Sequence, residues 1–256
     1  MRISVLREGA CLTAFEGQEE CNALYRGAYQ AGDVIRFEGE PGFYFIMADQ
    51  CVPLSRVYLP KGVYTYPVPL EGDGLNAYPP YAFQGDRHAL SMRPCRDWKG
   101  GNLALNPADR RGESEAYPHV TANVETRGES NFAARNVIDG LHTADGHGSW
   151  PYGSWGIGTR EDAEILLEFG RPVRAESMVL YLRADFPHDA WWTEGKATLS
   201  DGTELSFPLE KKNGPQWVDL GNREITWIKL WGLKKADGDS PFPALRQWEV
   251  YGSEIG

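Results

Sequence analysis

The feature that most limits the fold of this chain is a repeated alternation of apolar and polar residues over short segments ended by turns. Residues 33–38 alternate in part and stop at Gly39, and residues 203–207 alternate after an Asp-Gly pair. A period of two is typical of half-buried β-strands, and no stretch keeps a helical period through three turns. The 29 glycines and 17 prolines supply frequent chain reversals. The sequence therefore predicts an all-β protein.

Two pairs of segments predict β-hairpins. Residues 56–59 and 63–68 are separated by Pro-Lys-Gly, and residues 196–200 and 203–207 are separated by Asp-Gly. Proline and glycine reverse the chain, and Asp-Gly between two strand-like segments is a strong hairpin signal. We expect each pair to form neighbouring antiparallel strands.

The chain divides into two strand-rich regions with a segment of different character between them. Residues 1–96 hold short strands and predict a small antiparallel β-sandwich, and residues 119–256 hold at least seven longer strands. Residues 97–118 are polar, rich in turn-forming residues and aperiodic, as is typical of a linker. A chain of 256 residues is long enough for two domains. The prediction is two β-sandwich domains joined over residues 97–118.

Charge is distributed unevenly along the chain. Residues 1–112 carry 12 Lys and Arg against 13 Asp and Glu, and residues 113–256 carry 14 against 23, so the second part holds -9 of the net -10. Nucleic acid and anionic membranes need a basic surface, which excludes them as partners for that part. No apolar run approaches the roughly 18 residues of a membrane span. A neutral polar ligand or a cation fits the charge, and assembly into a homo-oligomer stays open.

Two features bear on the cellular compartment. The first eight residues already hold two arginines and a glutamate, so charge is met before a signal-peptide core could form. We expect a cytoplasmic protein as the sequence stands, or a secreted or cell-surface protein if the chain is cut from a longer precursor. The four cysteines include no Cys-x-x-Cys pair, which argues against a zinc ribbon. Reduced thiols fit a cytoplasmic protein, and two disulfides fit a secreted or cell-surface protein.

The order of short motifs in residues 119–253 resembles a known family. An Asn-Val-Ile-Asp-Gly motif at 136–140 is followed by Ser-Trp pairs at 149–150 and 154–155, and Gln-Trp-Glu-Val-Tyr-Gly at 247–252 resembles a closing strand. This order is similar to the galactose-binding-like (discoidin, coagulation factor 5/8 type C) domains. The resemblance implies an eight-stranded jelly roll, like that of family 32 carbohydrate-binding modules, with ligands held by loops at one end. Residues 1–96 resemble no family that we recognise.

The same resemblance raises a structural calcium ion. Such domains often hold calcium with an acidic side chain near the Asp-Gly turn, with backbone carbonyls and with a glutamate at the start of the last strand. Asp139 matches the first position, but Gln247 stands at the last one and is a weaker ligand for a hard cation. Glu249 lies two residues further on. The alternative for Asp139 is that it caps its own turn, because Asp-Gly reverses a chain without a metal.

Two loops concentrate residues that could recognise a ligand. Residues 141–155 and 183–192 hold three of the five histidines and four of the nine tryptophans. An exposed aromatic ring stacks on the apolar face of a sugar, and Arg, Asp and His supply hydrogen-bonding groups for its hydroxyls. The predicted ligand-binding residues are His147, Trp150, Tyr152, Arg183, Asp185, His188, Trp191 and Trp192. The alternative is that the tryptophans close the end of the sandwich and that Arg183 pairs with a neighbouring aspartate.

These observations favour a non-catalytic, lectin-like protein that binds a neutral or weakly charged glycan through loops of its C-terminal domain. One alternative is a carbohydrate-active enzyme, if the two loops meet and their histidines and aspartates form a cluster (His142, Asp145, His147, Asp185, His188 and Asp189). No HExxH, GxSxG or phosphate-loop motif supports that alternative. The other alternative is an adaptor whose rings form a protein–protein interface. No residue is predicted to be catalytic.

Overall fold

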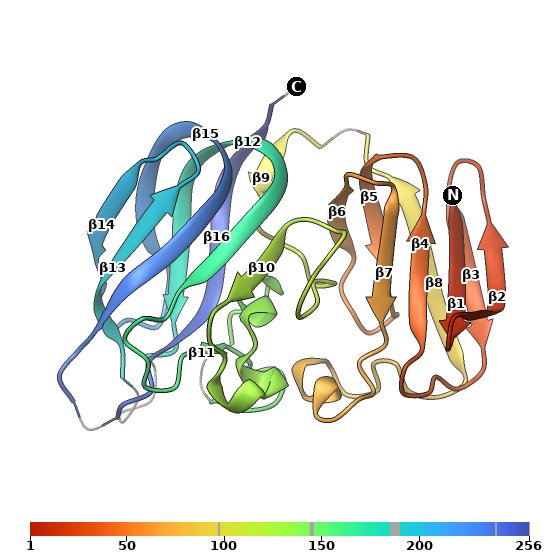
Figure 1. The fold of residues 1–256 in the computed structure, drawn as a ribbon, viewed down its shortest axis with the longest axis horizontal. Helices are drawn as coiled ribbons and strands as arrows, with labels where there is room; N and C mark the ends of the chain where they lie inside the picture. Colours follow the sequence, from red (N-terminus) through yellow and green to blue (C-terminus); the bar gives the residue numbers. More distant parts are fainter. Residues whose placement is uncertain (97, 144–145, 185–189, 239, 256) are drawn as a thin grey trace.

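Strands dominate the protein. The computed structural model describes residues 1–96, 98–143, 146–184, 190–238 and 240–255, and within them the helices are short 3-10 turns. The predicted all-β class is therefore confirmed. Two stacks of strands lie side by side, red to orange for the first part of the chain and green to blue for the second (Figure 1). No helix in this part of the chain is long and apolar enough to cross a membrane.

The N-terminal half is a sandwich of two four-stranded antiparallel sheets. In spatial order the first sheet contains β2 (Ala10–Glu16), β1 (Arg2–Arg7), β4 (Val34–Glu38) and β7 (Val63–Pro67). The second contains β3 (Cys21–Arg26), β8 (Arg87–Pro94), β5 (Gly42–Met47) and β6 (Ser55–Leu59). The 3-10 turn η1 (Gly74–Ala77) lies between β7 and β8. Alternation along the strands directs Ile35 and Phe37 of one sheet and Tyr44 and Ile46 of the other into a shared core.

One of the two predicted hairpins is wrong. β6 and β7 belong to different sheets, so the Pro-Lys-Gly turn carries the chain across the sandwich instead of joining neighbours. Gly62 adopts a φ of +67°, and a Cβ atom there would lie 2.0 Å from the carbonyl oxygen of Gly39, so only glycine fits. The other hairpin is confirmed, because β13 (Trp192–Leu199) pairs antiparallel with β14 (Glu204–Pro208) across the Asp-Gly turn.

The C-terminal half is built on three long strands, β12 (Ile165–Leu182), β15 (Gln216–Lys235) and β16 (Ala244–Glu254). Shorter strands complete it, namely β9 (Gly100–Asn102), β10 (His119–Ala122) and β11 (Trp155–Gly156) with β13 and β14. The 3-10 turns η2 (Thr126–Gly128), η3 (Ser130–Phe132) and η4 (Ala134–Ile138) lie between β10 and β11. The strand order is β11-β16-β12-β15-β13-β14, with β10 against β12 and β9 against β16, and these eight strands fit the expected jelly roll.

The long strands cross from one layer of this sandwich to the other. The pairing of β12 is interrupted between Glu168 and Val173. Its first part pairs with β10 and the middle of β15, and its second part pairs with β16 and the first half of β15. Leu167 of the first part and Leu180 of the second both lie in the same core. The end of β12 and the start of β16 therefore lie at one end of the sandwich, beside β11 (Figure 1).

From residue 98 onward, the segment predicted as a linker packs against both halves. β9 adds to the edge of β16, Leu103 is buried in the C-terminal core, and Ala108 and Ala116 are buried in the N-terminal core. Polar side chains are tolerated inside this segment because they find hydrogen bonds. Asn106 donates to the Pro118 carbonyl at 2.8 Å, and Asp109 accepts the Val120 N–H at 3.1 Å. Such a segment is a packed junction between the halves.

Two further contacts join the halves at this junction. Tyr58 of β6 and Tyr117 exchange both backbone hydrogen bonds, at 2.7 and 3.0 Å. The Glu254 carboxylate of β16 accepts from Arg56 of β6 at 3.0 Å and from Arg171. Burial alone would raise the pKa of Glu254, but the two guanidinium groups outweigh it and hold this pKa below its usual value.

Candidate functional site

A cavity of about 250 Å³ opens between the loops at one end of the C-terminal half. We call it the end cavity. Its walls come from η2, η3, the loop before β11, the residue after β12 and the residues before β16. The lining residues are Thr126, Arg127, Phe132, His147, Gly156, Gly158, Arg183, Phe242, Pro243 and Ala244. The volume is somewhat below the roughly 300–1,000 Å³ of pockets for drug-sized ligands, which suits a single ring.

The chain places a charged donor, an imidazole and an aromatic ring at this cavity. Arg183 directly follows β12, is only 4% exposed, and donates its backbone N–H to the Ala244 carbonyl at 3.0 Å. His147 is exposed on the loop before β11, and Phe242 is 49% exposed just before β16. The guanidinium offers a fixed fork of N–H donors, and the ring offers an apolar face.

Close backbone packing shapes one wall of the end cavity. A Cβ atom on Gly156 would lie 2.8 Å from the Thr126 hydroxyl oxygen and 3.1 Å from the Phe132 ring. That hydroxyl in turn accepts the Gly158 N–H at 2.8 Å. A Cβ atom at Gly156 would therefore displace the Thr126 hydroxyl, so this wall depends on close packing and on a hydrogen bond.

Two of the predicted ligand-binding residues, His147 and Arg183, thus meet in one cavity. Asp185 and His188 lie outside the described residues. The prediction that Trp192 offers an exposed stacking ring is wrong. The side chain is 1% exposed and packs with Trp155 in the core, with ring centroids 6.3 Å apart. Trp191 is half-buried against the same core, and the Lys211 ammonium lies 5.2 Å from the centroid of its ring.

Trp150 and Tyr152 are not among the described residues that line the end cavity. The Trp150 backbone N–H donates to the Asn76 carbonyl of the N-terminal half at 2.7 Å, and Trp150 lines a cavity of about 140 Å³ with Tyr78 and Arg135. The half-buried Tyr152 ring lies 3.1–3.2 Å from where a Cβ of Gly146 would be. Trp150 therefore contacts the N-terminal half and contributes to the junction between the halves.

Phe242 was missed by the sequence reasoning, although the sequence contains a signal for it. The residue stands between Pro241 and Pro243. Proline lacks a backbone N–H and is unsuited to the interior of a sheet, so an aromatic residue between two prolines is expected in a loop. A large apolar side chain in a loop is a candidate for an exposed ring.

The surroundings of Asp139 do not fit the calcium ion that the resemblance implied. The Asp139 carboxylate accepts the Leu141 N–H at 2.9 Å, as a turn cap does, and lies 3.6 Å from the Arg246 guanidinium. A divalent ion beside that guanidinium would meet a repulsion of roughly 8 kcal/mol at about 4 Å and an effective dielectric constant of about 20. Gln247 is fully buried, and its amide atoms have no hydrogen-bond partner among the described residues.

Only His142 and His147 of the histidine–aspartate cluster of the enzyme alternative are among the described residues. The Nε2 atom of His142 lies 3.2 Å from the Glu249 carboxylate. The His142 ring makes a T-shaped contact with the Tyr181 ring, with ring centroids 4.4 Å apart. Asp145 and Asp189 lie outside the described residues. Within the described ranges, no group of three or more His, Cys, Asp or Glu side chains is arranged to hold a metal ion.

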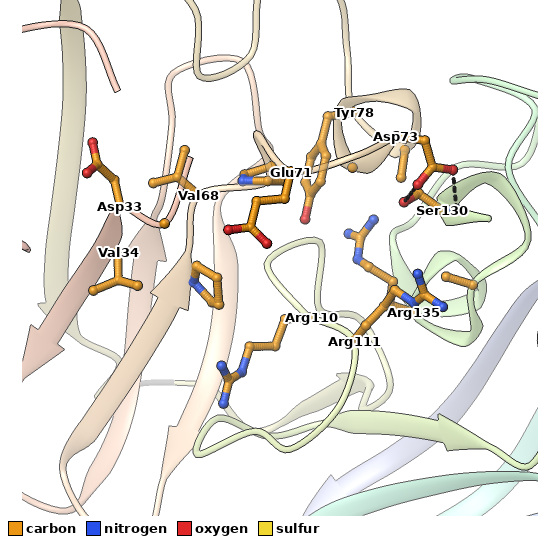
Figure 2. Close-up of a pocket in the computed structure, with 16 residues that line it drawn as sticks. Asp33, Val34, Val68, Glu71, Asp73, Tyr78, Arg110, Arg111, Ser130 and Arg135 are labelled. Atoms are coloured by element: carbon orange, nitrogen blue, oxygen red, sulfur yellow. Dashed lines mark hydrogen bonds between the residues drawn. The ribbon is translucent and has the colours of Figure 1, made fainter. Parts of the chain in front are cut away.

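A larger cavity of about 420 Å³ lies between the two halves, and Figure 2 shows the side chains around it. Most of its charged groups are engaged. Asp73 accepts the N–H and hydroxyl of Ser130 at 2.7 and 2.9 Å, as the dashed lines mark, and Asp33 binds Arg7 at 2.7 Å. Arg135 donates to two backbone carbonyls. Asp73 and Arg135 hold the junction together, whereas the end cavity gathers two of the predicted ligand-binding residues and an exposed ring, so we take the end cavity as the candidate site.

Comparison with known proteins gives similarity in structure alone. No protein-family model matches the sequence, and no curated protein matches it. Among solved structures, a family 32 carbohydrate-binding module from C. perfringens NanJ in complex with galactose is 17% identical and covers 52% of this chain and 91% of its own, with a TM-score of 0.40.

Two more solved structures are of the same kind. Chitosan-binding module 1 of a chitosanase/glucanase from Paenibacillus sp. IK-5 is 18% identical, covers 59% of this chain and 99% of its own, and has a TM-score of 0.42. A Streptococcus pneumoniae fucose-binding module is 14% identical, covers 59% of this chain and 97% of its own, and has a TM-score of 0.40. They are sugar-binding modules, the group that the motifs of residues 136–252 resemble. At TM-scores near 0.4 this similarity carries no weight for the site, which rests on the contacts given above.

Proposed function

We propose that the protein binds a neutral or weakly charged glycan through the end cavity, without catalysis. One observation carries this proposal: Arg183 and His147, from separate loops, line a single cavity together with the exposed ring of Phe242. A sugar presents an apolar C–H face and a rim of hydroxyls. The cavity offers an aromatic face for the first and N–H donors for the second.

Charge and size narrow the ligand class. The second part of the chain holds -9 of the net charge, which disfavours a polyanionic glycan. The end cavity, at about 250 Å³, has room for one sugar ring and leaves the rest of a longer glycan in solvent. Affinity should be modest, because each hydrogen bond replaces one that water already makes.

The experiment begins with the full chain on a glycan array, followed by titration calorimetry of the best ligand. Phe242→Ala should weaken binding about 10- to 100-fold, the loss expected for an aromatic contact at the centre of a site. Its melting temperature should stay near that of the parent protein, because the ring is 49% exposed. His147→Ala should weaken binding by a smaller factor.

Trp217→Ala is the matched control. Trp217 is 62% exposed, stacks on Tyr251 on the face of the sheet, and is absent from the described lining of the end cavity. Binding that survives in Phe242→Ala but fails in Trp217→Ala would move the site to the sheet face. Binding restricted to sulfated or polycarboxylated glycans would contradict the charge argument.

A further inference from the structure

The Arg246 side chain is buried among oxygen atoms. It is 1% exposed, and its Nε donates to the Thr143 carbonyl at 3.0 Å. Nη1 donates to the Asn136 carbonyl at 3.4 Å, and Nη2 donates to the Pro151 carbonyl at 3.3 Å. Nη2 also lies 3.6 Å from Oδ1 of Asp139. Three backbone carbonyls and one carboxylate therefore converge on a single buried cation, and we call these four groups the oxygen site.

A β-bulge brings Arg246 to this position. Along β16, Gln247 is paired with Tyr181 of β12 and Leu245 is paired with Leu182, so Arg246 is an extra residue without a partner on β12. A bulge inserts one residue and turns its side chain away from the regular alternation. Arg246 can therefore reach the carbonyls of Asn136, Thr143 and Pro151 from near the start of a paired strand.

The composition of the oxygen site is the kind that hard cations take. Carboxylate and backbone carbonyl oxygens are the preferred ligands of Ca²⁺. A guanidinium is also a cation, remains charged in proteins, and offers five N–H donors in a fixed fork. We propose that Arg246 is a built-in structural cation, which occupies the oxygen site and makes this end of the sandwich independent of a bound metal.

The oxygen site lies on the loop that also carries His147. Asn136, Thr143 and Pro151 stand before and after that residue, so one guanidinium ties several points of the loop to β16. Arg246 is thus a positioning residue for a wall of the end cavity. The proposal concerns folding and metal dependence, and it holds or fails whether or not a glycan binds.

The test measures melting temperatures of the full chain with EDTA and with about 10 mM CaCl₂, a concentration that fills weak calcium sites. The parent protein should melt at the same temperature in both. Arg246→Ala should melt roughly 6–20 °C lower in EDTA, as expected when one partner of a buried charged pair is removed. CaCl₂ should then recover part of that loss, and MgCl₂ should recover less because Mg²⁺ gives up its water reluctantly.

Arg223→Ala is the matched control, since Arg223 is 41% exposed and pairs with Asp201 at the surface. It should melt within about 1 °C of the parent protein in both buffers. If Arg246→Ala does not fold, Arg246→Lys replaces it in the test because lysine keeps the positive charge. Its melting temperature should lie below that of the parent protein and should not change when CaCl₂ is added. A parent protein that is destabilised by EDTA overturns the proposal. So does a fall of less than about 2 °C in Arg246→Ala, or a larger fall that calcium does not recover.

Discussion

The two halves of the molecule differ in the charged side chains that they bury. The N-terminal half buries the carboxylates of Asp33 and Asp49. The described part of the C-terminal half buries arginine side chains together with two carboxylates, namely Arg135, Arg171, Arg183, Arg246, Asp139 and Glu249. These arginines lie in the part of the chain that carries nearly all of the net negative charge. Net charge therefore reports on the surface of this half and not on what its interior contains.

The difference follows from which backbone groups the loops leave without a partner. The Asp49 carboxylate accepts the N–H groups of Cys51 and Phe83 at 2.8 and 3.1 Å. Arg135 donates to the carbonyls of Pro107 and Asp109, at 2.7 Å each. A buried backbone group without a hydrogen bond costs stability, so loops rich in free N–H need an anion and loops rich in free carbonyls need a cation.

The largest effect on stability is expected at Arg135, which is 4% exposed. Arg135→Met keeps much of the volume but removes the cation, and the two carbonyls that it serves lose their donor. The free energy of unfolding should fall by about 3–5 kcal/mol, measured by urea denaturation. Arg174→Met on an exposed position of β12 is the control and should change it little. A loss below about 1 kcal/mol at Arg135 would show that its burial is incidental.

A smaller loss is expected for the corresponding anion of the N-terminal half. Asp49→Ala removes the acceptor of two backbone N–H groups, and the free energy of unfolding should fall by about 1–3 kcal/mol. Asp86→Ala, at an exposed position, provides the baseline. If Asp49→Ala proved more damaging than Arg135→Met, the C-terminal half would not be the one that depends more on its buried charge.

The two halves should also respond to pH in opposite directions. The hydrogen bond from Arg7 lowers the pKa of Asp33, so its stabilising contribution is present above about pH 4 and is lost as pH falls through the lowered value. Burial lowers the pKa of His119 in the C-terminal half, but Asp109 at 2.7 Å outweighs this and raises it overall. The His119 contribution is therefore full below about pH 6.5 and is lost as pH rises through the raised value.

Melting curves from pH 3 to pH 9 check this contrast. The melting temperature of Asp33→Asn should lie below that of the parent protein at pH 7 and approach it in acid. The gap for His119→Asn should instead be widest near about pH 5.5 and close toward pH 9. Gaps that do not change with pH would mean that neither pair contributes through its charge.

The smallest effect is expected at the exposed pair Arg160 and Asp162, where both side chains face solvent. Arg160→Gln should shift the melting temperature by no more than about 1 °C, and high salt should remove even that shift. A shift comparable with that of Arg135→Met would contradict the distinction between buried and surface arginines.

Local alternation predicts which segments are strands but not which sheet each strand joins. Residues 63–68 were expected to pair with residues 56–59, yet the two strands lie in opposite sheets, because a tight turn serves both arrangements equally well. The Asp-Gly hairpin was predicted correctly, since the turn and the pairing are both local. Burial of the 97–118 segment depends on contacts with both cores, which no local pattern contains.

The candidate site was predictable to the extent that its residues cluster in loops. Arg183 and His147 were found in this way, while Trp192 was misassigned because of irregular pairing. Counting back from the buried Leu199 at a strict period of two would place Trp192 outward, but the register against β15 shifts twice along β13 and turns the ring inward. Arg246 escaped notice for a similar reason, since a bulge is invisible in the sequence pattern.

The packed junction between the halves determines where the chain can be cut if the C-terminal half is to be fused to another protein. β9 covers the edge of β16, and Leu103 fills part of the C-terminal core, although both precede the first residue of the predicted C-terminal domain. A cut at residue 119 would expose the edge of β16 and leave a cavity where Leu103 packs in that core. The portable unit for fusion or domain exchange therefore starts before β9, and the bridge between Tyr58 and Tyr117 makes its separation from the N-terminal half incomplete even then.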